Sequence, residues 1–102
     1  MAQPLILVTA AREHSPDPYV DCLQRRGARV RVVSPQEAMP PDDPMSGATA
    51  LLLTGGADVD PELYGEAIDP KAGVHTNRRR DDMEMVLLRH ALRENLPVLG
   101  VC

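Results

Sequence analysis

The sequence contains no phenylalanine and no tryptophan, and Tyr19 and Tyr64 are its two tyrosines. A buried core must therefore be built from aliphatic side chains and methionine, which is typical of the interior of a parallel α/β sheet. The 102 residues, 43% of them hydrophobic, are enough for one domain and too few for two.

Other scarcities narrow the class of protein further. Two cysteines, Cys22 and Cys102, are too few for a disulfide framework and indicate reduced thiols. The first apolar run, residues 5–8, follows no basic segment and is too short for a signal peptide or a membrane span. The 11 basic and 15 acidic residues give a net charge of −4, which disfavours binding to nucleic acid. We therefore expect a cytoplasmic protein with neither a membrane nor nucleic acid as partner.

Short aliphatic runs alternate with helical patterns along the chain. Residues 5–8, 30–33, 48–53 and 97–101 predict strands; the second suits a half-exposed sheet edge and the fourth a buried position. The proline-rich residues 34–47 predict a loop, and residues 62–80 predict a long excursion beyond the strand ends. This order predicts an α/β, flavodoxin-like three-layer sandwich with a mostly parallel sheet, truncated after the fourth strand. In that fold the first, third and fourth strands are neighbours.

Two helices are predicted between these strands. The first begins at Ser15 and Pro16, a capping residue followed by a proline suited to the first turn, and ends before Gly27. Cys22 lies on its apolar face, so we expect a buried, unreactive thiol. The second helix is expected from Asp81 to about Glu94. Its expected core-facing side chains are Met83, Met85, Val86, Leu87, Leu88, Ala91 and Leu92.

Two strand ends carry residues that suit a cysteine hydrolase. Gly55 and Gly56 follow the third strand, and Cys102 follows the fourth. Because the carboxyl ends of adjacent parallel strands meet at one sheet edge, we expect Cys102 to lie close to the two glycines. A thiolate that attacks an amide needs backbone N–H donors for the oxygen that becomes negative, and glycine lets such donors face a substrate. Each feature alone also fits a structural role, namely an ordinary strand-to-helix turn and a buried thiol.

The acidic residues near this edge allow more than one interpretation. Asp58 and Asp60 suit either magnesium ligands or turn residues before Pro61. Asp81 and Glu84 have the spacing of a capping box, in which each satisfies a backbone donor of the first helical turn. No catalytic role is needed to explain that pair.

The basic residues and histidines are equally open to structural explanations. The run Arg78–Arg80 suits either an anionic ligand or a solvated surface before a helix. None of the three histidines, His14, His75 and His90, has the spacing of a metal ligand set. We therefore expect no metal site and no cofactor.

Three strings of residues together resemble a known family. They are LTGGADVDPELYGE from Leu53 to Glu66, Arg80-Asp81 with Glu84, and LPVLGVC from Leu96 to Cys102. They resemble the class I glutamine amidotransferase-like hydrolases, and most of all the gamma-glutamyl-gamma-aminobutyrate hydrolase family, peptidase family C26. The likeness is strong over residues 48–102 and rests on the order of elements over residues 1–47. It implies that residues 1–102 are the N-terminal half of a single domain of this type.

The resemblance implies a function and an assignment of residues. Cys102 would be the nucleophile, and the amides of Gly56 and Gly55 would form part of the oxyanion hole. A γ-glutamyl amide, a small molecule, would be hydrolysed through a thioester to glutamate and an amine. The family places a His and a Glu downstream of its nucleophile, so residues 1–102 alone are expected to be inactive.

Other interpretations stay open at this point. One is the glutaminase part of an amidotransferase, which passes ammonia to a partner. Another is a non-catalytic flavodoxin-like binding module. For the assembly of subunits, a homodimer is the state that we consider.

Overall fold

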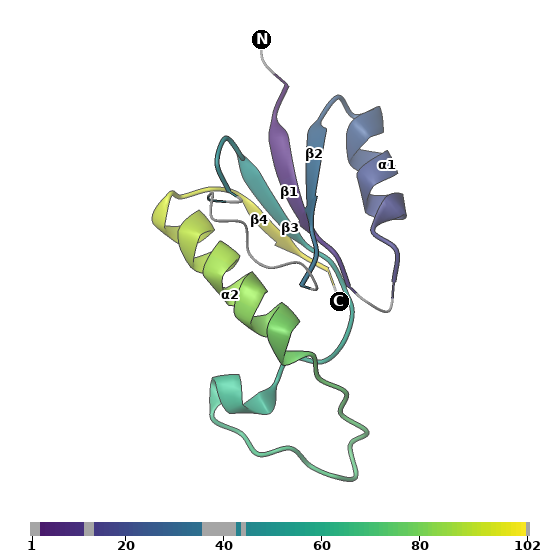
Figure 1. Ribbon diagram of the computed structural model, residues 1–102, viewed down its shortest axis with the longest axis vertical. Coiled ribbons are helices and arrows are strands. Elements are labelled where there is room, and N and C mark those ends of the chain that lie inside the picture. Colours follow the sequence, from purple (N-terminus) through teal and green to yellow (C-terminus); the bar gives the residue numbers. More distant parts are fainter. Residues whose placement is uncertain (1–2, 12–13, 36–42, 44, 102) are drawn as a thin grey trace.

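Four parallel strands form one sheet in the order β2-β1-β3-β4 (Figure 1). The computed structural model describes residues 3–11, 14–35, 43 and 45–101. The strands are β1 (Leu5–Thr9), β2 (Arg29–Val33), β3 (Ala50–Leu53) and β4 (Val98–Gly100). Helix α1 (Asp17–Arg25) joins β1 to β2. The 3-10 helix η1 (Pro61–Tyr64) and helix α2 (Arg78–Arg93) lie between β3 and β4.

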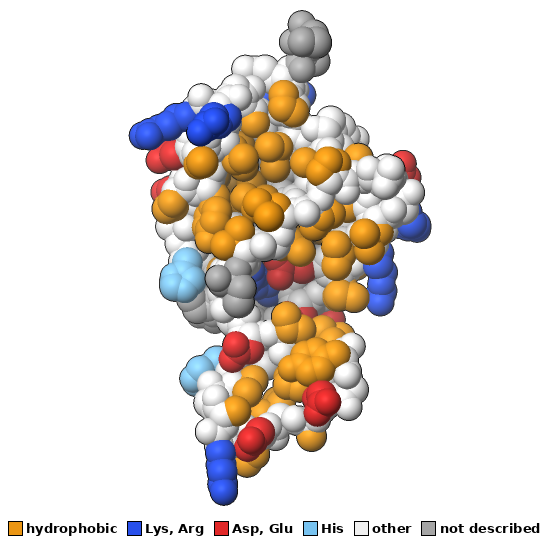
Figure 2. Space-filling view, turned by 180° about the vertical axis from the view of Figure 1, so that it is seen from behind, with side chains coloured by type: hydrophobic (Ala, Val, Ile, Leu, Met, Phe, Trp, Pro, Cys, Tyr) orange, Lys and Arg blue, Asp and Glu red, His pale blue; other side chains and the backbone are white. Residues whose placement is uncertain are grey.

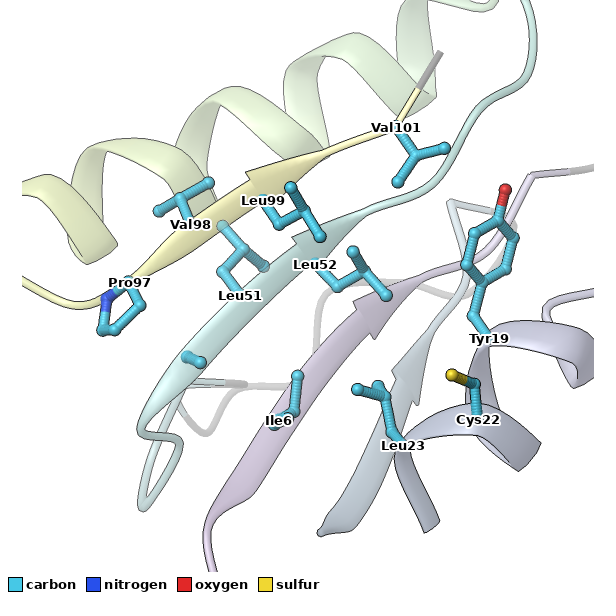
Figure 3. Close-up of a pocket in the computed structure, with 11 residues that line it drawn as sticks. Ile6, Tyr19, Cys22, Leu23, Leu51, Leu52, Pro97, Val98, Leu99 and Val101 are labelled. Carbon is cyan, nitrogen blue, oxygen red and sulfur yellow. The ribbon is translucent and has the colours of Figure 1, made fainter. Parts of the chain in front are cut away.

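The two helical crossovers run in opposite directions across the sheet. Right-handed connections therefore place α1 and α2 on opposite faces, and Figure 3 shows the sheet between them. The result is an all-parallel α/β sheet with flanking helices, consistent with a flavodoxin-like fold. The predicted fold class is confirmed, and so is the adjacency of the first, third and fourth strands.

The core lies between the sheet and α2. Leu7 and Leu51 are opposite each other in β1 and β3, and both are buried together with Leu87 of α2. Met45, only 2% exposed, joins them from the loop before β3, a contribution that the proline-rich loop pattern did not predict. The other buried members of this cluster are Val33, Met83 and Ala91. As expected from the composition, this core is built of aliphatic side chains and methionine.

The opposite face of the sheet is only partly covered, by α1. Between α1 and β4 lies an apolar hollow of about 330 Å³, and hydrophobic side chains gather over this face (Figure 2). Figure 3 shows Tyr19, Cys22 and Leu23 of α1 along one side of it, with Leu99 and Val101 along the other. The prediction of a buried Cys22 is wrong: Cys22 is exposed, because α1 turns it toward the open hollow.

The predicted exposure is confirmed for one edge strand and is wrong for the other. β2 lies at one edge, with Arg29 and Arg31 exposed, as its alternating pattern predicts. β4 lies at the other edge, and the prediction that it is a buried strand is wrong. Leu99 is 62% exposed because it faces the uncovered hollow. An aliphatic run predicts that a strand forms, but it does not predict how far other parts of the protein bury that strand.

Both helices begin at residues other than those that the sequence pattern predicts. Pro16 caps α1, and the Ser15 hydroxyl accepts a hydrogen bond from the Asp17 N–H at 3.2 Å. Helix α2 begins at Arg78, three residues before the predicted start at Asp81. Its cap is Asn77, whose side chain accepts from the Arg80 N–H at 3.2 Å. The charged residues from 78 onward are therefore part of the helix and not of the loop before it.

Helix α2 buries a narrower stripe than predicted. Met83, Leu87 and Ala91 face the core, whereas Val86 is 53% and Leu92 66% exposed. The reason is that the sheet contacts one face of the helix only, and positions to either side of that stripe stay in water. Within the described part of the chain, no helix is long and apolar enough to cross a membrane.

Candidate active site

The carboxyl ends of β3 and β4 lie side by side. Leu53, the last residue of β3, is opposite Gly100, and the Val101 N–H donates to the Leu53 carbonyl at 2.8 Å. Gly55 follows Leu53 by two residues, as Cys102 follows Gly100. Cys102 lies outside the described residues, so its proximity to the glycines stays a prediction. The neighbouring strand ends that the prediction requires are present.

Two buried threonines join the ends of β1 and β3. Thr9 is 0% and Thr54 6% exposed. The Thr54 N–H donates to the Thr9 hydroxyl at 3.2 Å, and the Thr54 hydroxyl donates to the Thr9 carbonyl at 2.8 Å. These bonds continue the pairing of the two strands past their last ladder bonds. They fix the backbone at the residue that enters the Gly55-Gly56 turn.

Arg80, on the first turn of α2, is the buried cation of this edge. It is 4% exposed, whereas its neighbours Arg78 and Arg79 are exposed. Its Nη2 donates to the Thr54 carbonyl, and its Nε lies 3.4 Å from Oε1 of Glu84. Nε is buried and makes no hydrogen bond within the described part of the chain, so its contact with Glu84 is ionic attraction. Of the two interpretations of the arginine run, a solvated surface fits Arg78 and Arg79 and fails for Arg80.

Glu84 connects the guanidinium to β1. Its Oε2 accepts a hydrogen bond of 2.7 Å from the Thr9 hydroxyl and lies 3.5 Å from Nη2 of Arg80. Burial raises the pKa of Glu84 above its ordinary value, and the Thr9 hydrogen bond and the Arg80 charge oppose that rise. The predicted capping role for Glu84 is wrong, because its carboxylate reaches across to the sheet instead.

Gly56 is held against this cluster. A Cβ added at Gly56 would overlap Nη1 of Arg80 and would lie 2.8 Å from Cβ of Ala11. No side chain fits at this position without moving the buried guanidinium or Ala11. The sequence suggested glycine because its amide can face a substrate, and the structure adds a steric requirement.

The loop after the glycines is anchored by carboxylates. Asp81 also fails to cap α2, because its Oδ2 accepts from the Asp60 N–H at 2.9 Å. Asp60 in turn accepts from the Glu62 N–H at 3.0 Å and lies 3.3 Å from Nη1 of Arg78. Asp58 accepts from the His75 N–H at 3.1 Å. Asp60 thus caps η1, as expected of a turn residue, whereas Asp58 joins the two ends of the loop.

No metal site is formed by the acidic residues that the structure describes. Among these residues, no group of three or more His, Cys, Asp or Glu side chains is arranged to hold an ion. The carboxylates at this edge bind backbone N–H groups, Thr9 or arginine. What the site offers is a rigid, glycine-containing backbone turn beside a buried cation.

Sequence reasoning found the glycines and missed the cluster beneath them. The sequence pattern gave no role to Thr9, which directly follows the predicted strand 5–8, and it treated Arg80 as part of a charge run. One indication was available: a threonine directly after an aliphatic run is often placed to bond across a strand end. The Arg80-Asp81 pair with Glu84 was also part of the family resemblance, although no role followed from it.

The comparison with known proteins agrees with that resemblance. The family model "Peptidase C26" matches residues 6–102. A Schizosaccharomyces pombe protein named "Putative glutamine amidotransferase" is 30% identical over 105 residues, covering 100% of this chain and 40% of the relative. A Mycobacterium tuberculosis protein of the same description is 37% identical over 90 residues, covering 85% of this chain and 29% of the relative.

A third relative carries a similar name. The Lactococcus lactis protein "Putative glutamine amidotransferase-like protein YvdE" is 36% identical over 84 residues, covering 82% of this chain and 35% of the relative. The chain thus spans well under half the length of these curated relatives. Because the family model matches almost all of its residues, the chain belongs to the Peptidase C26 family.

Proposed function

We propose that residues 1–102 supply the nucleophile and the oxyanion-stabilising turn of a cysteine hydrolase that cleaves γ-glutamyl amides. The observation that supports this most is the hydrogen bond of 2.8 Å between Val101 and Leu53, because it joins the strands that precede Cys102 and Gly55. A nucleophile and N–H donors at one sheet edge are the elements that acyl transfer needs.

In the proposed reaction the Cys102 thiolate attacks the γ-carbonyl carbon. A C–S bond forms, and the carbonyl oxygen becomes an oxyanion that accepts hydrogen bonds from the amides of Gly55 and Gly56. Collapse breaks the C–N bond, and the amine leaves with a proton. Water then attacks the thioester, releasing glutamate and returning the thiol.

An acid–base partner must move these protons, and His90 is too far from the glycine turn to supply it. His90 lies ten residues beyond Arg80 on α2, about 15 Å further along the helix axis. Its ring Nδ1 lies 3.8 Å from Asp43, away from the glycine turn. The partner is expected from residues that follow Cys102, as the family resemblance implies.

The names of the relatives favour a second candidate with the same first step. In a glutaminase the substrate is glutamine and the amine is ammonia, which a partner would consume. Both candidates use the same nucleophile and turn. They differ in the amine that the substrate carries.

The test uses the complete polypeptide that contains these residues. Cys102→Ser should lower turnover of γ-glutamyl-4-nitroanilide by at least about 10³-fold, since the nucleophile is lost. Cys22→Ser is the matched control and should leave turnover unchanged, because Cys22 is an exposed residue of α1 and no part of the glycine turn. Intact mass after rapid quenching should detect a γ-glutamyl adduct on wild-type protein and not on Cys102→Ser.

Each alternative has its own outcome in this experiment. Preference for glutamine over γ-glutamyl anilide by kcat/KM would favour the glutaminase. Unchanged turnover in Cys102→Ser would remove this residue from the mechanism. An inactive wild-type protein that forms no adduct would favour the non-catalytic binding module.

A further inference from the structure

Arg80 is placed where an arginine is costly. Its side chain is 5% exposed and that of Glu84 17%, so both charges have lost most of their water. A buried ion pair seldom stabilises a fold more than apolar side chains of similar size would, because desolvation offsets the attraction. Stability alone therefore does not account for this pair, and its contacts indicate what it does.

The guanidinium contacts the peptide group that begins the glycine turn. Nη2 donates to the Thr54 carbonyl, and this carbonyl belongs to the same planar unit as the Gly55 N–H. The peptide is trans, so the N–H points away from the oxygen that Arg80 holds. The direction of the Gly55 N–H is thus fixed by the position of the guanidinium.

The same contact also changes the strength of that donor. A carbonyl that accepts a hydrogen bond from a cation is polarised, and a polarised peptide donates more strongly through its N–H. The effect is larger where water is excluded, as it is around Thr54, which is 6% exposed. Arg80 therefore acts on both the direction and the donor strength of Gly55.

The rest of the cluster keeps Arg80 in position. Glu84 holds the guanidinium from the helix side, and Thr9 holds Glu84 through a bond of 2.7 Å. Gly56 lies so close to Nη1 that an added Cβ would overlap it, so the turn has no freedom to move toward the cation. The guanidinium therefore contacts the turn at two points, the Thr54 carbonyl and Gly56.

We propose that Arg80 is a positioning residue, which aligns and polarises the Thr54–Gly55 peptide so that the Gly55 N–H can stabilise the oxyanion. This rests on the proposed function, since it assigns a task within the same site. Arg80 does not touch the substrate. It acts through one backbone peptide that does.

The test compares Arg80→Lys with Arg79→Lys in the complete polypeptide. Lysine keeps the positive charge beside Glu84 but lacks the planar fork that reaches both Glu84 and the Thr54 carbonyl. Arg79 is the matched control, an exposed arginine one residue earlier on the same helix. Turnover of γ-glutamyl-4-nitroanilide is divided by the amount of folded protein, which the denaturant unfolding transition of each variant gives.

Arg80→Lys should lower kcat per folded site by about 10²-fold, the usual effect of losing one oxyanion donor, with KM and the alkylation rate of Cys102 little changed. Hydrogen exchange should accelerate at residues 54–57 and not in β1. Arg79→Lys should match wild type in every measurement. A merely structural Arg80 would reduce the folded fraction and leave kcat per folded site unchanged.

A second variant covers the case in which Arg80→Lys does not fold. Glu84→Gln keeps the guanidinium and weakens its anchor, so it should also lower kcat per site with KM unchanged. If the folded variants keep kcat per site within about twofold of wild type, the proposal is overturned. An active wild type with normal Arg80 variants thus overturns the positioning role alone, whereas a wild type without γ-glutamyl amidase activity overturns the proposed function as well.

Discussion

Thr9→Val tests the buried cluster with the smallest change of shape. Valine matches threonine in size and lacks the hydroxyl, so the packing around this fully buried side chain is kept. Two interactions are lost: the donor to Glu84 at 2.7 Å and the acceptor for the Thr54 N–H at 3.2 Å. The change in the free energy of unfolding therefore measures the lost hydrogen bonds and not the creation of a cavity.

The expected loss follows from these two bonds. A hydrogen bond to a charged carboxylate contributes about 1.5–3 kcal/mol, and a buried N–H left without an acceptor costs about 1–3 kcal/mol. Valine buries a methyl group in place of the hydroxyl, and this burial offsets part of the loss in stability. We expect the free energy of unfolding to fall by about 2–4 kcal/mol, a large share of the roughly 5–15 kcal/mol that holds a typical domain together.

Chemical denaturation of the complete polypeptide measures this loss, with Thr49→Val as control. The Thr49 hydroxyl also bonds a strand backbone, donating to the Leu5 carbonyl at 3.3 Å, but Thr49 is exposed. Water can replace that bond, so the control should lose no more than about 0.5–1 kcal/mol. Equal losses in the two variants would refute the view that Thr9 is part of a buried, energetically coupled cluster.

The loss in Thr9→Val should also depend on pH. The hydroxyl lowers the pKa of Glu84, so without it the carboxyl is charged less readily in the folded protein. The destabilisation should be largest at pH values above the raised pKa of Glu84, where the carboxylate is ionised, and should shrink as the pH falls and Glu84 is protonated. A loss independent of pH would mean that Glu84 does not respond to Thr9.

Two further predictions concern the core and the titration of the site. Leu87→Ala should lower the free energy of unfolding by about 2–5 kcal/mol, since Leu87 is 1% exposed, whereas Leu92→Ala, at a position 66% exposed, should change it by no more than about 0.5 kcal/mol. Denaturant titrations compare the two, and similar losses would contradict the placement of α2. Burial raises the pKa of Glu84, so the folded state binds its proton more tightly than the unfolded state does. Stability should therefore fall as the pH rises from the ordinary carboxyl pKa of 4.5 through the raised value, then level off. Glu84→Gln should lack this part of the pH profile.

The sequence by itself determined the fold, and it predicted the edge at which a site would lie. Short aliphatic runs separated by helical patterns leave few arrangements other than a parallel sheet with crossovers on both faces. Because strand ends of one direction gather at one edge, Gly55 and Cys102 were predicted to be neighbours although Cys102 comes 46 positions after Gly56. The adjacency of β3 and β4 confirms the part of this inference that the structure describes.

Only the tertiary structure decided which polar and apolar groups are buried. The Arg78–Arg80 run looks uniform in sequence, yet Arg80 alone is enclosed, because the crossover brings the first turn of α2 over the ends of β1 and β3. The Thr9–Glu84 bond joins residues 75 positions apart, a distance at which local patterns carry no information. Cys22 and Leu99 show the converse, since both read as core residues and both face the hollow beside α1. Periodicity tells which way a side chain points from its own helix or strand, and burial depends on what another part of the chain places opposite it.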